Sequence, residues 1–345
     1  MTEKPNIISR VMSARGMGQV IIVTLFQIAM MVVFQIVAPR FLTPGNISNL
    51  MRQIAPFIIV GIGQSYVLIT GNIDLSIGSV LGMTSMISAT LMTKGVNPWL
   101  AALCCVPASL LVGIINGTLV SNFNLPPFIA TLGTMTIARG IAQAANKGYA
   151  TGAIEIIIPP DGVVLPEAEM EAHKTIAERF RQVFYYGKIG PFFYTILIAL
   201  ALWAVFFIIL TYTTTGRHIY AVGSNIEAAK MSGISVPKTI HTAYMVSAFC
   251  AGIAGLVNCA QSGTGSMTAG QSYELYGVAA SVIGGISTLG GQGSLLGTVI
   301  GAAVWATLAN GLALKNVPLA YQNIIVGIIV IVSVLVDVVI RRKRQ

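Results

Sequence analysis

Charged residues are scarce in this chain of 345 residues: 9% are Asp, Glu, Lys or Arg, and 55% are apolar. A soluble domain carries charge on about a quarter of its residues. A soluble fold of this length would have too few polar side chains to cover its outside. The composition therefore excludes a cytosolic enzyme, a disordered chain and a secreted disulfide scaffold. It indicates a polytopic membrane protein.

The sequence also lacks the motifs of nucleotide, metal and catalytic chemistry. No Gly-x-x-x-x-Gly-Lys-Ser/Thr segment occurs, so the chain cannot hold ATP as P-loop proteins do, and ATP must be used by another polypeptide. Its apolar runs contain no His-x-x-x-His pair, Ser/His/Asp set or pair of carboxylates on one helix, so we expect no catalytic and no metal-binding residue. The cysteines lie in apolar stretches without zinc-ligand spacing and are interpreted as packing residues: Cys104, Cys105, Cys250 and Cys259.

Ten apolar runs approach the length of about 20 residues that a membrane-spanning helix needs. Glycine and proline separate most of them. The run at 273–289 is the weakest, because Glu274, Gly284 and Gly285 dilute it. We therefore predict an all-α protein with about ten spans, near 18–38, 54–71, 75–93, 98–120, 128–146, 192–212, 240–260, 273–289, 294–313 and 320–340.

The ends of the chain indicate its orientation. An even number of spans puts both termini on one side of the membrane. Lys4, Arg10 and Arg15 precede the first span, and the basic residues 341–344 directly follow the last, which favours the cytoplasm for both termini. The pattern of residues 6–15 is typical of a short interfacial helix. The net charge of +9 thus indicates anchoring at membrane lipid and no nucleic-acid partner.

The segment 147–190 is the one sizeable loop expected outside the cytoplasm. Residues 167–181 combine helical spacing with charges of both signs, which predicts an exposed helix with apolar residues on one side: Ala168, Ala172, Ile176 and Phe180. Two interpretations remain open for this helix, a solvated cap or a docking surface for an extracytoplasmic partner.

The cytoplasmic loop 211–239 carries a second short helix. Ser224 and Glu227 form a capping box, Lys230 suits the last turn, and Gly233 is a stop signal. These signals predict a helix of about two turns within 225–232. Because so short a helix is marginal alone, it packs either on its own span ends or in a groove of a cytoplasmic subunit.

Four motifs carry a resemblance to a known family. They are Ala-x-Gly-x-Asn-x-x-Ala-Ala-x-x-Ser-Gly at 221–233, Thr-Gly-Asn-Ile-Asp-Leu-Ser-Ile-Gly-Ser at 70–79, Leu-Pro-Pro-Phe-Ile-Ala-Thr-Leu-Gly-Thr at 125–134 and the glycine-rich segment 284–291. Together they resemble the permeases of bacterial ABC sugar importers of the ribose/galactose/xylose type, over roughly residues 40–340. The charged loop at about 155–185 departs from the family in its length.

The resemblance implies a single permease domain, residues 1–345, with the compact ten-span architecture of such importers and a cytoplasmic coupling helix between spans six and seven. It also implies an inner membrane of a bacterium and three protein partners: a cytoplasmic ATPase subunit that uses ATP and Mg, an extracytoplasmic sugar-binding protein, and a second permease chain in a homodimer. Contact with the ATPase is expected at Gly223, Ser224, Asn225, Glu227, Ala228, Ala229 and Gly233.

Five residues are candidates for the translocation path: Asp74, Asn72, Phe128, Thr131 and Asn258. A carboxylate within the membrane is usually functional, but Asp74 or Asn72 is equally suited to cap a helix that begins at Leu75. Asparagines within spans bind either a neighbouring helix or a passing sugar hydroxyl.

The sequence thus predicts a permease subunit, not an enzyme, that translocates a pentose or hexose with ATP hydrolysed in a separate subunit. An importer of the same class for a nucleoside or a branched-chain amino acid is the alternative. A stand-alone ion-coupled transporter is less favoured, because it would need intramembrane acids and only Asp74 and Glu274 qualify. A membrane-embedded enzyme would need one of the catalytic sets that are missing.

Overall fold

The computed structural model describes residues 17–159 and 163–318 and, in the last segment, 320–322, 324–325, 327–329, 331–332 and 335. The interfacial helix predicted at 6–15 and the basic residues at 341–344 lie outside the described residues. In chain order the elements are α2 (Met17–Val37), α3 (Pro44–Ile69), α4 (Ile77–Thr93), α5 (Pro98–Ser121), α6 (Pro127–Ala145), α7 (Glu167–Arg181), the π-helical turn η1 (Gln182–Tyr186), β1 (Lys188–Ile189), β2 (Phe192–Phe193), α8 (Tyr194–Tyr212), α9 (Thr214–Ser224), α10 (Ile226–Met231), α11 (Val236–Ser262), α12 (Tyr273–Ile283) and α13 (Leu295–Leu314).

Proline and asparagine fix the starts of several long helices. Pro44, Pro98 and Pro127 are the first residues of α3, α5 and α6, where the missing N–H costs nothing. Asn97 caps α5 through a 2.9 Å hydrogen bond that its side chain accepts from the N–H of Trp99. The two short strands pair antiparallel, with Lys188 opposite Phe193.

Six helices of the described part are long and apolar enough to cross a membrane, namely α2, α3, α5, α8, α11 and α13. The chain is therefore a helical protein with several spans, as predicted, but the predicted number of about ten is not confirmed. α4 has 17 residues and α6 has 19, and both coincide with predicted spans. The last predicted span, 320–340, lies only partly within the described residues.

α12 is shorter than the span predicted at 273–289. It has 11 residues and is about 16 Å long, roughly half of the hydrocarbon core. Gly284 and Gly285 follow it, and Gly285 has φ +94°. Just before it, Gly270 and Ser272 also have positive φ, +72° and +67°. α12 is thus a half-length helix with a turn of the backbone on each side.

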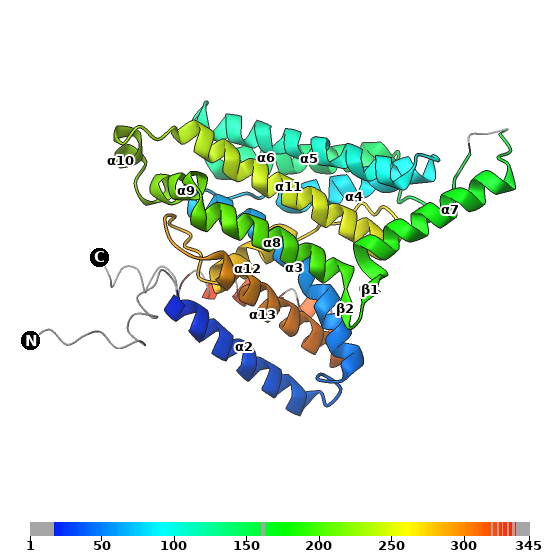
Figure 1. Cartoon of the computed structure of the whole chain (residues 1–345), viewed down its shortest axis with the longest axis horizontal. Coiled ribbons are helices and arrows are strands. Elements are labelled where there is room, and N and C mark those ends of the chain that lie inside the picture. The colour runs from blue at the N-terminus through cyan, green and yellow to red at the C-terminus, as the bar shows by residue number, and fades with distance from the viewer. Residues whose placement is uncertain are drawn as a thin grey trace, which may run out of the picture.

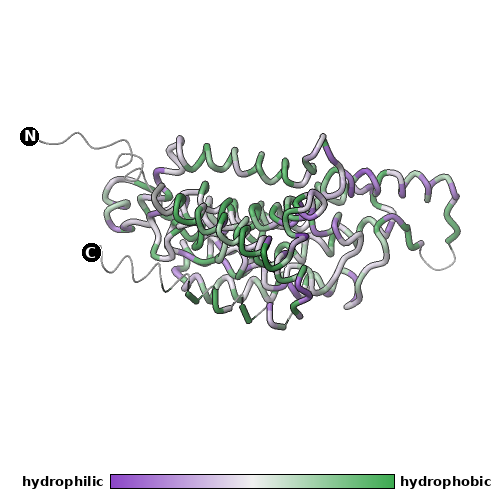
Figure 2. Tube along the Cα trace, turned by 90° about the horizontal axis from the view of Figure 1, so that it is seen from below, coloured by the Kyte–Doolittle hydropathy of each residue, from purple (hydrophilic) through white to green (hydrophobic). Residues whose placement is uncertain are grey.

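The long helices lie side by side along the long axis of the molecule (Figure 1). α9 and α10 lie at one end, which we call the α10 end, and α7 with β1 and β2 lies at the other, the α7 end. α2 begins at the α10 end. Hydrophobic residues predominate along the body, and hydrophilic segments gather towards the two ends (Figure 2).

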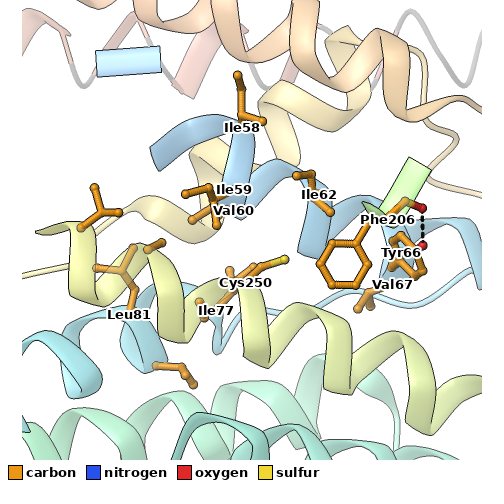
Figure 3. Close-up of a cluster of buried hydrophobic side chains, with 14 of the residues drawn as sticks. Ile58, Ile59, Val60, Ile62, Tyr66, Val67, Ile77, Leu81, Phe206 and Cys250 are labelled. Carbon is orange, nitrogen blue, oxygen red and sulfur yellow. Dashed lines mark hydrogen bonds between the residues drawn. The ribbon is translucent and has the colours of Figure 1, made fainter. Parts of the chain in front are cut away.

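α3 and α11 form the interior. Within their most apolar stretches 78% and 72% of residues are buried, against 6% for the peripheral helix α2. The centre of the core brings together buried side chains of α3, α4, α8 and α11, among them Ile62, Ile77 and Cys250 (Figure 3). Tyr66 donates a 2.6 Å hydrogen bond to the carbonyl of Phe206, which satisfies its hydroxyl inside the core.

The interpretation of the cysteines as packing residues is confirmed for three of the four. Cys105, Cys250 and Cys259 are buried and free, whereas Cys104 is exposed on the outside of α5. Residues on the outside of a membrane helix face lipid or another chain, so the apolar character of Cys104 still suits its position.

Candidate functional site

The loop between α8 and α11 contains the predicted short helix. Asn225 stands between α9 and α10 in an extended conformation, and its side chain accepts a 2.9 Å hydrogen bond from the N–H of Ala228. At the other end Gly233, with φ +77°, donates its N–H to the carbonyl of Lys230 over 2.9 Å. The signals within 225–232 therefore predicted the helix α10 correctly.

The capping residue differs from the prediction. Ser224 is the last residue of α9, and its hydroxyl donates to the carbonyl of Tyr220 over 2.8 Å, so Asn225 caps α10 instead. Glu227 does not complete a capping box and forms a 2.8 Å ion pair with Lys230. Serine and asparagine are equally good N-caps, so local sequence alone does not choose between the two positions.

α9 was missed by the sequence analysis. Its buried residues, Gly216, Ile219 and Val222, follow one another at intervals of three and face the body. The spacing of Ile219 and Val222 was the available signal, because apolar residues three apart lie on one side of a helix.

Most of α10 is open to solvent. Of the seven residues predicted to contact an ATPase, Ala229 is buried and Gly223 is half-buried, while the other five are exposed. Two apolar side chains of α10 are also exposed, Ile226 at 43% and Met231 at 91%. The structure therefore leaves most of the predicted contact residues accessible to a partner.

Asp74 is tied into a buried polar network. One carboxylate oxygen accepts from the N–H and the hydroxyl of Ser76 over 2.8 and 2.6 Å, and the other accepts from the hydroxyl of Ser247 over 2.6 Å. Asn116 donates to the hydroxyl of Ser76 over 2.9 Å and accepts from Thr134 over 2.7 Å. This network joins the start of α4 to α5, α6 and α11.

The network bears on the two interpretations of Asp74. α4 begins at Ile77 rather than at Leu75, and Asp74 binds the N–H of Ser76 directly before it. A carboxylate at this place satisfies backbone donors at the positive end of the helix dipole. Asp74 therefore binds the backbone directly before α4, but the capping of a helix at Leu75 is wrong, because the residue at the N-cap is Ser76. A role in the translocation path stays a prediction.

Asn72 and Asn258 make local contacts. Asn72 donates to the hydroxyl of Thr70 over 2.8 Å and does not cap α4. Asn258 on α11 accepts a 3.2 Å hydrogen bond from Ser85 on α4, which is the contact between helices that the sequence favoured.

The five path candidates do not form one cluster. Asn258 lies 11 residues after Ser247 on α11, about 16 Å from the Asp74 network. On α6, Phe128 is 56% exposed, whereas Thr131 is buried and donates to the carbonyl of Pro127 over 2.8 Å. The geometry therefore places Asn72 and Thr131 next to the Asp74 network, since Asn72 is in the same loop and the carbonyl of Thr131 accepts from Thr134, and it leaves Asn258 apart.

Two polar residues near α12 stand out, and sequence reasoning passed over one of them. Gln64 on α3 is fully buried, and within the described residues neither its side-chain oxygen nor its nitrogen has a hydrogen-bond partner. One oxygen of Glu274 is likewise buried without a partner and lies beside Gly78 of α4. An amide in the middle of an apolar span was the signal for Gln64. In the same described part no group of three His, Cys, Asp or Glu is placed to hold a metal ion.

The α7 end contains the predicted exposed helix with the predicted bounds. Its buried residues are His173, Ala177 and Phe180, so of the four apolar residues at helical spacing Phe180 is buried, Ile176 is half-buried, and Ala168 and Ala172 are exposed. The reason is that His173 hydrogen-bonds the carbonyl of Ile154 over 3.0 Å, which turns this side of α7 towards the body.

Arg181, the last residue of α7, joins this helix to the preceding loop and to α11. It pairs with Glu155 and donates to the carbonyl of Ala260 over 3.1 Å. Burial alone would lower the pKa of the Arg181 guanidinium, but the hydrogen bond and the charge of Glu155 outweigh burial and raise it. Arg181 therefore remains a cation and holds α7 in place.

Comparison with known families gives one match over most of the chain. Residues 46–334 match the family described as branched-chain amino acid transport system / permease component. No solved structure matches.

Several curated proteins are similar along nearly their full length. The ribose import permease protein RbsC of Bacillus subtilis is 34% identical, covering 89% of both chains. The D-allose transport system permease protein AlsC of Escherichia coli is 34% identical, covering 91% of this chain and 90% of that protein. The fructose import permease protein FrcC of Rhizobium meliloti is 31% identical, covering 89% of this chain and 81% of that protein.

Proposed function

The chain belongs to the branched-chain amino acid transport system / permease component family, and from this membership we propose that it is the membrane-spanning permease subunit of an ATP-binding cassette importer for a monosaccharide. The observation that carries the proposal is the similarity, over 89% or more of this chain, to permeases for ribose, D-allose and fructose. The cargo is accordingly a pentose or a hexose. The chain is a multi-pass inner-membrane protein and a transporter subunit, not an enzyme.

The partners follow from the same class of transporter. We infer that a separate ATPase subunit hydrolyses ATP with Mg at the α10 end, that a sugar-binding protein docks at the α7 end, and that a second copy of the chain completes a homodimer in membrane lipid. The six apolar helices, α4, α6, the half-length α12 and the last predicted span would together make the ten-span arrangement.

We propose that the α10 end lies in the cytoplasm. α2 begins at that end, and the basic residues of both termini favour the cytoplasmic side. The exposed Ile226 and Met231 of α10 support an insertion of this helix into a groove of the ATPase. Transport then proceeds by alternating access: a loaded binding protein docks outside, ATP closes the ATPase dimer, and α10 passes the motion to the spans.

The candidate path residues enter this mechanism as proposals. Asp74 and Asn72 lie in the loop that leads into α4, and Phe128 and Thr131 lie in the first turn of α6. Asn258 lies in the half of α11 that points to the α7 end. A path of this kind needs weak polar contacts, because a sugar that binds tightly is not released.

The docking of the ATPase is tested with Met231→Asp on α10. We expect it to reduce co-purification of the ATPase and ATP-dependent sugar uptake by about tenfold, because a charge replaces an apolar side chain in the groove. The matched control is Met170→Asp on α7, where another exposed methionine of a short helix should leave ATPase co-purification unchanged.

The cargo is tested in proteoliposomes that contain the chain, its ATPase and its binding protein. Labelled ribose, allose and fructose are compared with leucine and a nucleoside, which represent the alternative cargo classes. Uptake of a sugar that requires ATP supports the proposal. Uptake that needs no ATPase contradicts it and favours an ion-coupled transporter.

A further inference from the structure

Three segments meet at the α10 end, directly before the predicted coupling helix. They are the last turn of α9, the last turn of α3 and the loop 284–294 between α12 and α13. The N–H of Gly291 donates to the carbonyl of Ile69 over 2.8 Å, and the hydroxyl of Tyr220 donates to the carbonyl of Gly293 over 2.8 Å. We call this meeting point the glycine junction, formed by Ile69, Gly71, Tyr220, Gly223, Ser224, Gly290, Gly291 and Gly293.

Backbone packs against backbone in the glycine junction. A Cβ atom at Gly223 would overlap the carbonyl oxygen of Ile69 and would lie 2.6 Å from the nitrogen of Gly291. A Cβ atom at Gly290 would lie 2.8 Å from the carbonyl oxygen of Gly223 and 2.9 Å from the nitrogen of Gly71. At Gly223 and Gly290 the nearest neighbours are all backbone atoms, so a displacement at these two contacts has no rotamer change to absorb it.

The loop is itself held in one shape. Gly290, Gly291 and Gly293 have φ of +86°, +70° and +124°, which turn the chain back towards α9. The N–H of Ser287 donates to the carbonyl of Gln292 over 3.1 Å, and the hydroxyl of Ser287 accepts from the N–H of Leu289 over 3.1 Å. The loop should therefore move as one rigid unit when α9 is displaced.

The loop leads into the half-length helix α12. Backbone turns flank α12 on both sides, and α12 packs closely against α3 and α13. Gly284, directly after α12, lies against Gly297 in the first turn of α13, and Trp203 donates to the carbonyl of Leu295 over 3.0 Å. A movement of the loop thus reaches α12 and the start of α13 together.

The two ends of α10 differ in how they are held. At its start, Ser224 lies against Gly291 in the glycine junction. At its end, a Cβ atom added to Gly233 would have nothing within 4 Å, and Ala229, Ile234 and Val236 contact the core through side chains. The contact at the start of α10 is therefore the one in which backbone meets backbone.

We propose that Tyr220 and Gly223 are positioning residues that pass the displacement of α10 through the glycine junction to α12. Energy from ATP then reaches the transport path by way of α12, in addition to the contacts that α9 makes with α8 and α11. The proposal rests on the proposed function, since it assumes that an ATPase moves α10.

The first test is Tyr220→Phe, which removes the hydrogen bond to the carbonyl of Gly293 and keeps the ring. In proteoliposomes with the ATPase and the binding protein, we expect ATPase co-purification and ATP hydrolysis within about twofold of wild type. The amount of sugar transported per ATP should fall about fivefold, which is the change in an equilibrium that the loss of one hydrogen bond typically causes. The matched control is Tyr212→Phe, an exposed tyrosine at the end of α8, which should leave this ratio unchanged.

Gly223→Ala is the second variant and should uncouple more strongly, because its Cβ atom meets backbone on two sides. A Tyr220→Phe protein with the wild-type ratio of transport to hydrolysis overturns the proposal, even if Gly223→Ala fails to fold. An equal loss of transport and of hydrolysis also overturns it, since the residues would then only stabilise the chain. If the proposed function itself is wrong, the result is different: the wild-type chain binds no ATPase.

Discussion

The two ends of the molecule are held together by different means. At the α10 end, glycines let the backbones of α3, α9 and the loop 284–294 touch. At the α7 end, long side chains make the contacts between segments. The guanidinium of Arg52 on α3 lies 4.5 Å from the ring centre of Phe193 and 5.4 Å from that of Tyr185. Arg181 pairs with Glu155.

This difference predicts different mechanical behaviour. Backbone contacts have no rotamers to change, so the α10 end should move as a unit. Ion pairs and cation–π contacts tolerate small displacements, because long side chains adjust their rotamers. The α7 end can therefore adapt to a docking partner, while the α10 end transmits motion. Substitutions at the two ends should separate these properties.

The largest effect is expected from Gly291→Ala. Gly291 has φ +70°, and a Cβ atom there would overlap Ser224, so the variant combines backbone strain of about 1–2 kcal/mol with overpacking of about 1–3 kcal/mol. The matched control is Gly148→Ala at the α7 end, which has φ +81° but open space around it and should show the strain alone.

Thermal unfolding in detergent compares the two glycine variants. The difference between their losses of stability measures the packing of the glycine junction. Equal losses would contradict the backbone contact described for the α10 end.

A smaller loss of stability is expected from Arg181→Gln at the α7 end. The variant leaves the largely buried Glu155 without its cation, which costs about 1.5–3 kcal/mol. Because the α7 end does not transmit force in our comparison, sugar transported per ATP should stay unchanged in the folded protein. Thermal unfolding and the transport ratio are both measured. A changed ratio at normal hydrolysis would show that the two ends do not differ in this way.

Arg52 offers a milder test of the same end. Arg52→Leu removes a cation from the ring of Phe193 and should cost about 0.5–2 kcal/mol, whereas Arg52→Lys keeps the charge and should cost less. Thermal unfolding of both variants separates the charge from the loss of packing. Equal losses for leucine and lysine would mean that the planar guanidinium, not the charge, stabilises the contact with Phe193.

The sequence predicted the α7 end better than the α10 end. The residues 167–181 predicted α7 with both of its bounds, because charge and spacing are local signals. α10 was predicted with its cap displaced by one residue, since α9 takes Ser224 as its own last residue. The glycine junction depends on contacts between segments more than 60 residues apart, and no local pattern contains that information.

The candidate path shows the same limit. Asp74 was a sound candidate by residue type, but its three hydrogen bonds come from Ser76 nearby and from Ser247, a partner far along the chain. The half-length of α12 follows from the positive φ at Gly285, which composition alone only suggested. The family motifs predicted the class of protein, and the family match over residues 46–334 confirms it.

The smallest effect on stability is expected at the exposed pair of Glu227 and Lys230 on α10. The two side chains are 77% and 56% exposed, so their ion pair contributes about 0.2–0.5 kcal/mol and weakens as salt is added. Glu227→Gln should therefore leave thermal unfolding of the isolated chain nearly unchanged. If Glu227 contacts the ATPase as proposed, the same variant should lower ATPase affinity, and more so at low salt. Lys174→Gln removes the similar exposed pair with Glu171 on α7 and should affect neither measurement. A variant of Glu227 that destabilises the isolated chain would instead place this side chain within the packing of the α10 end.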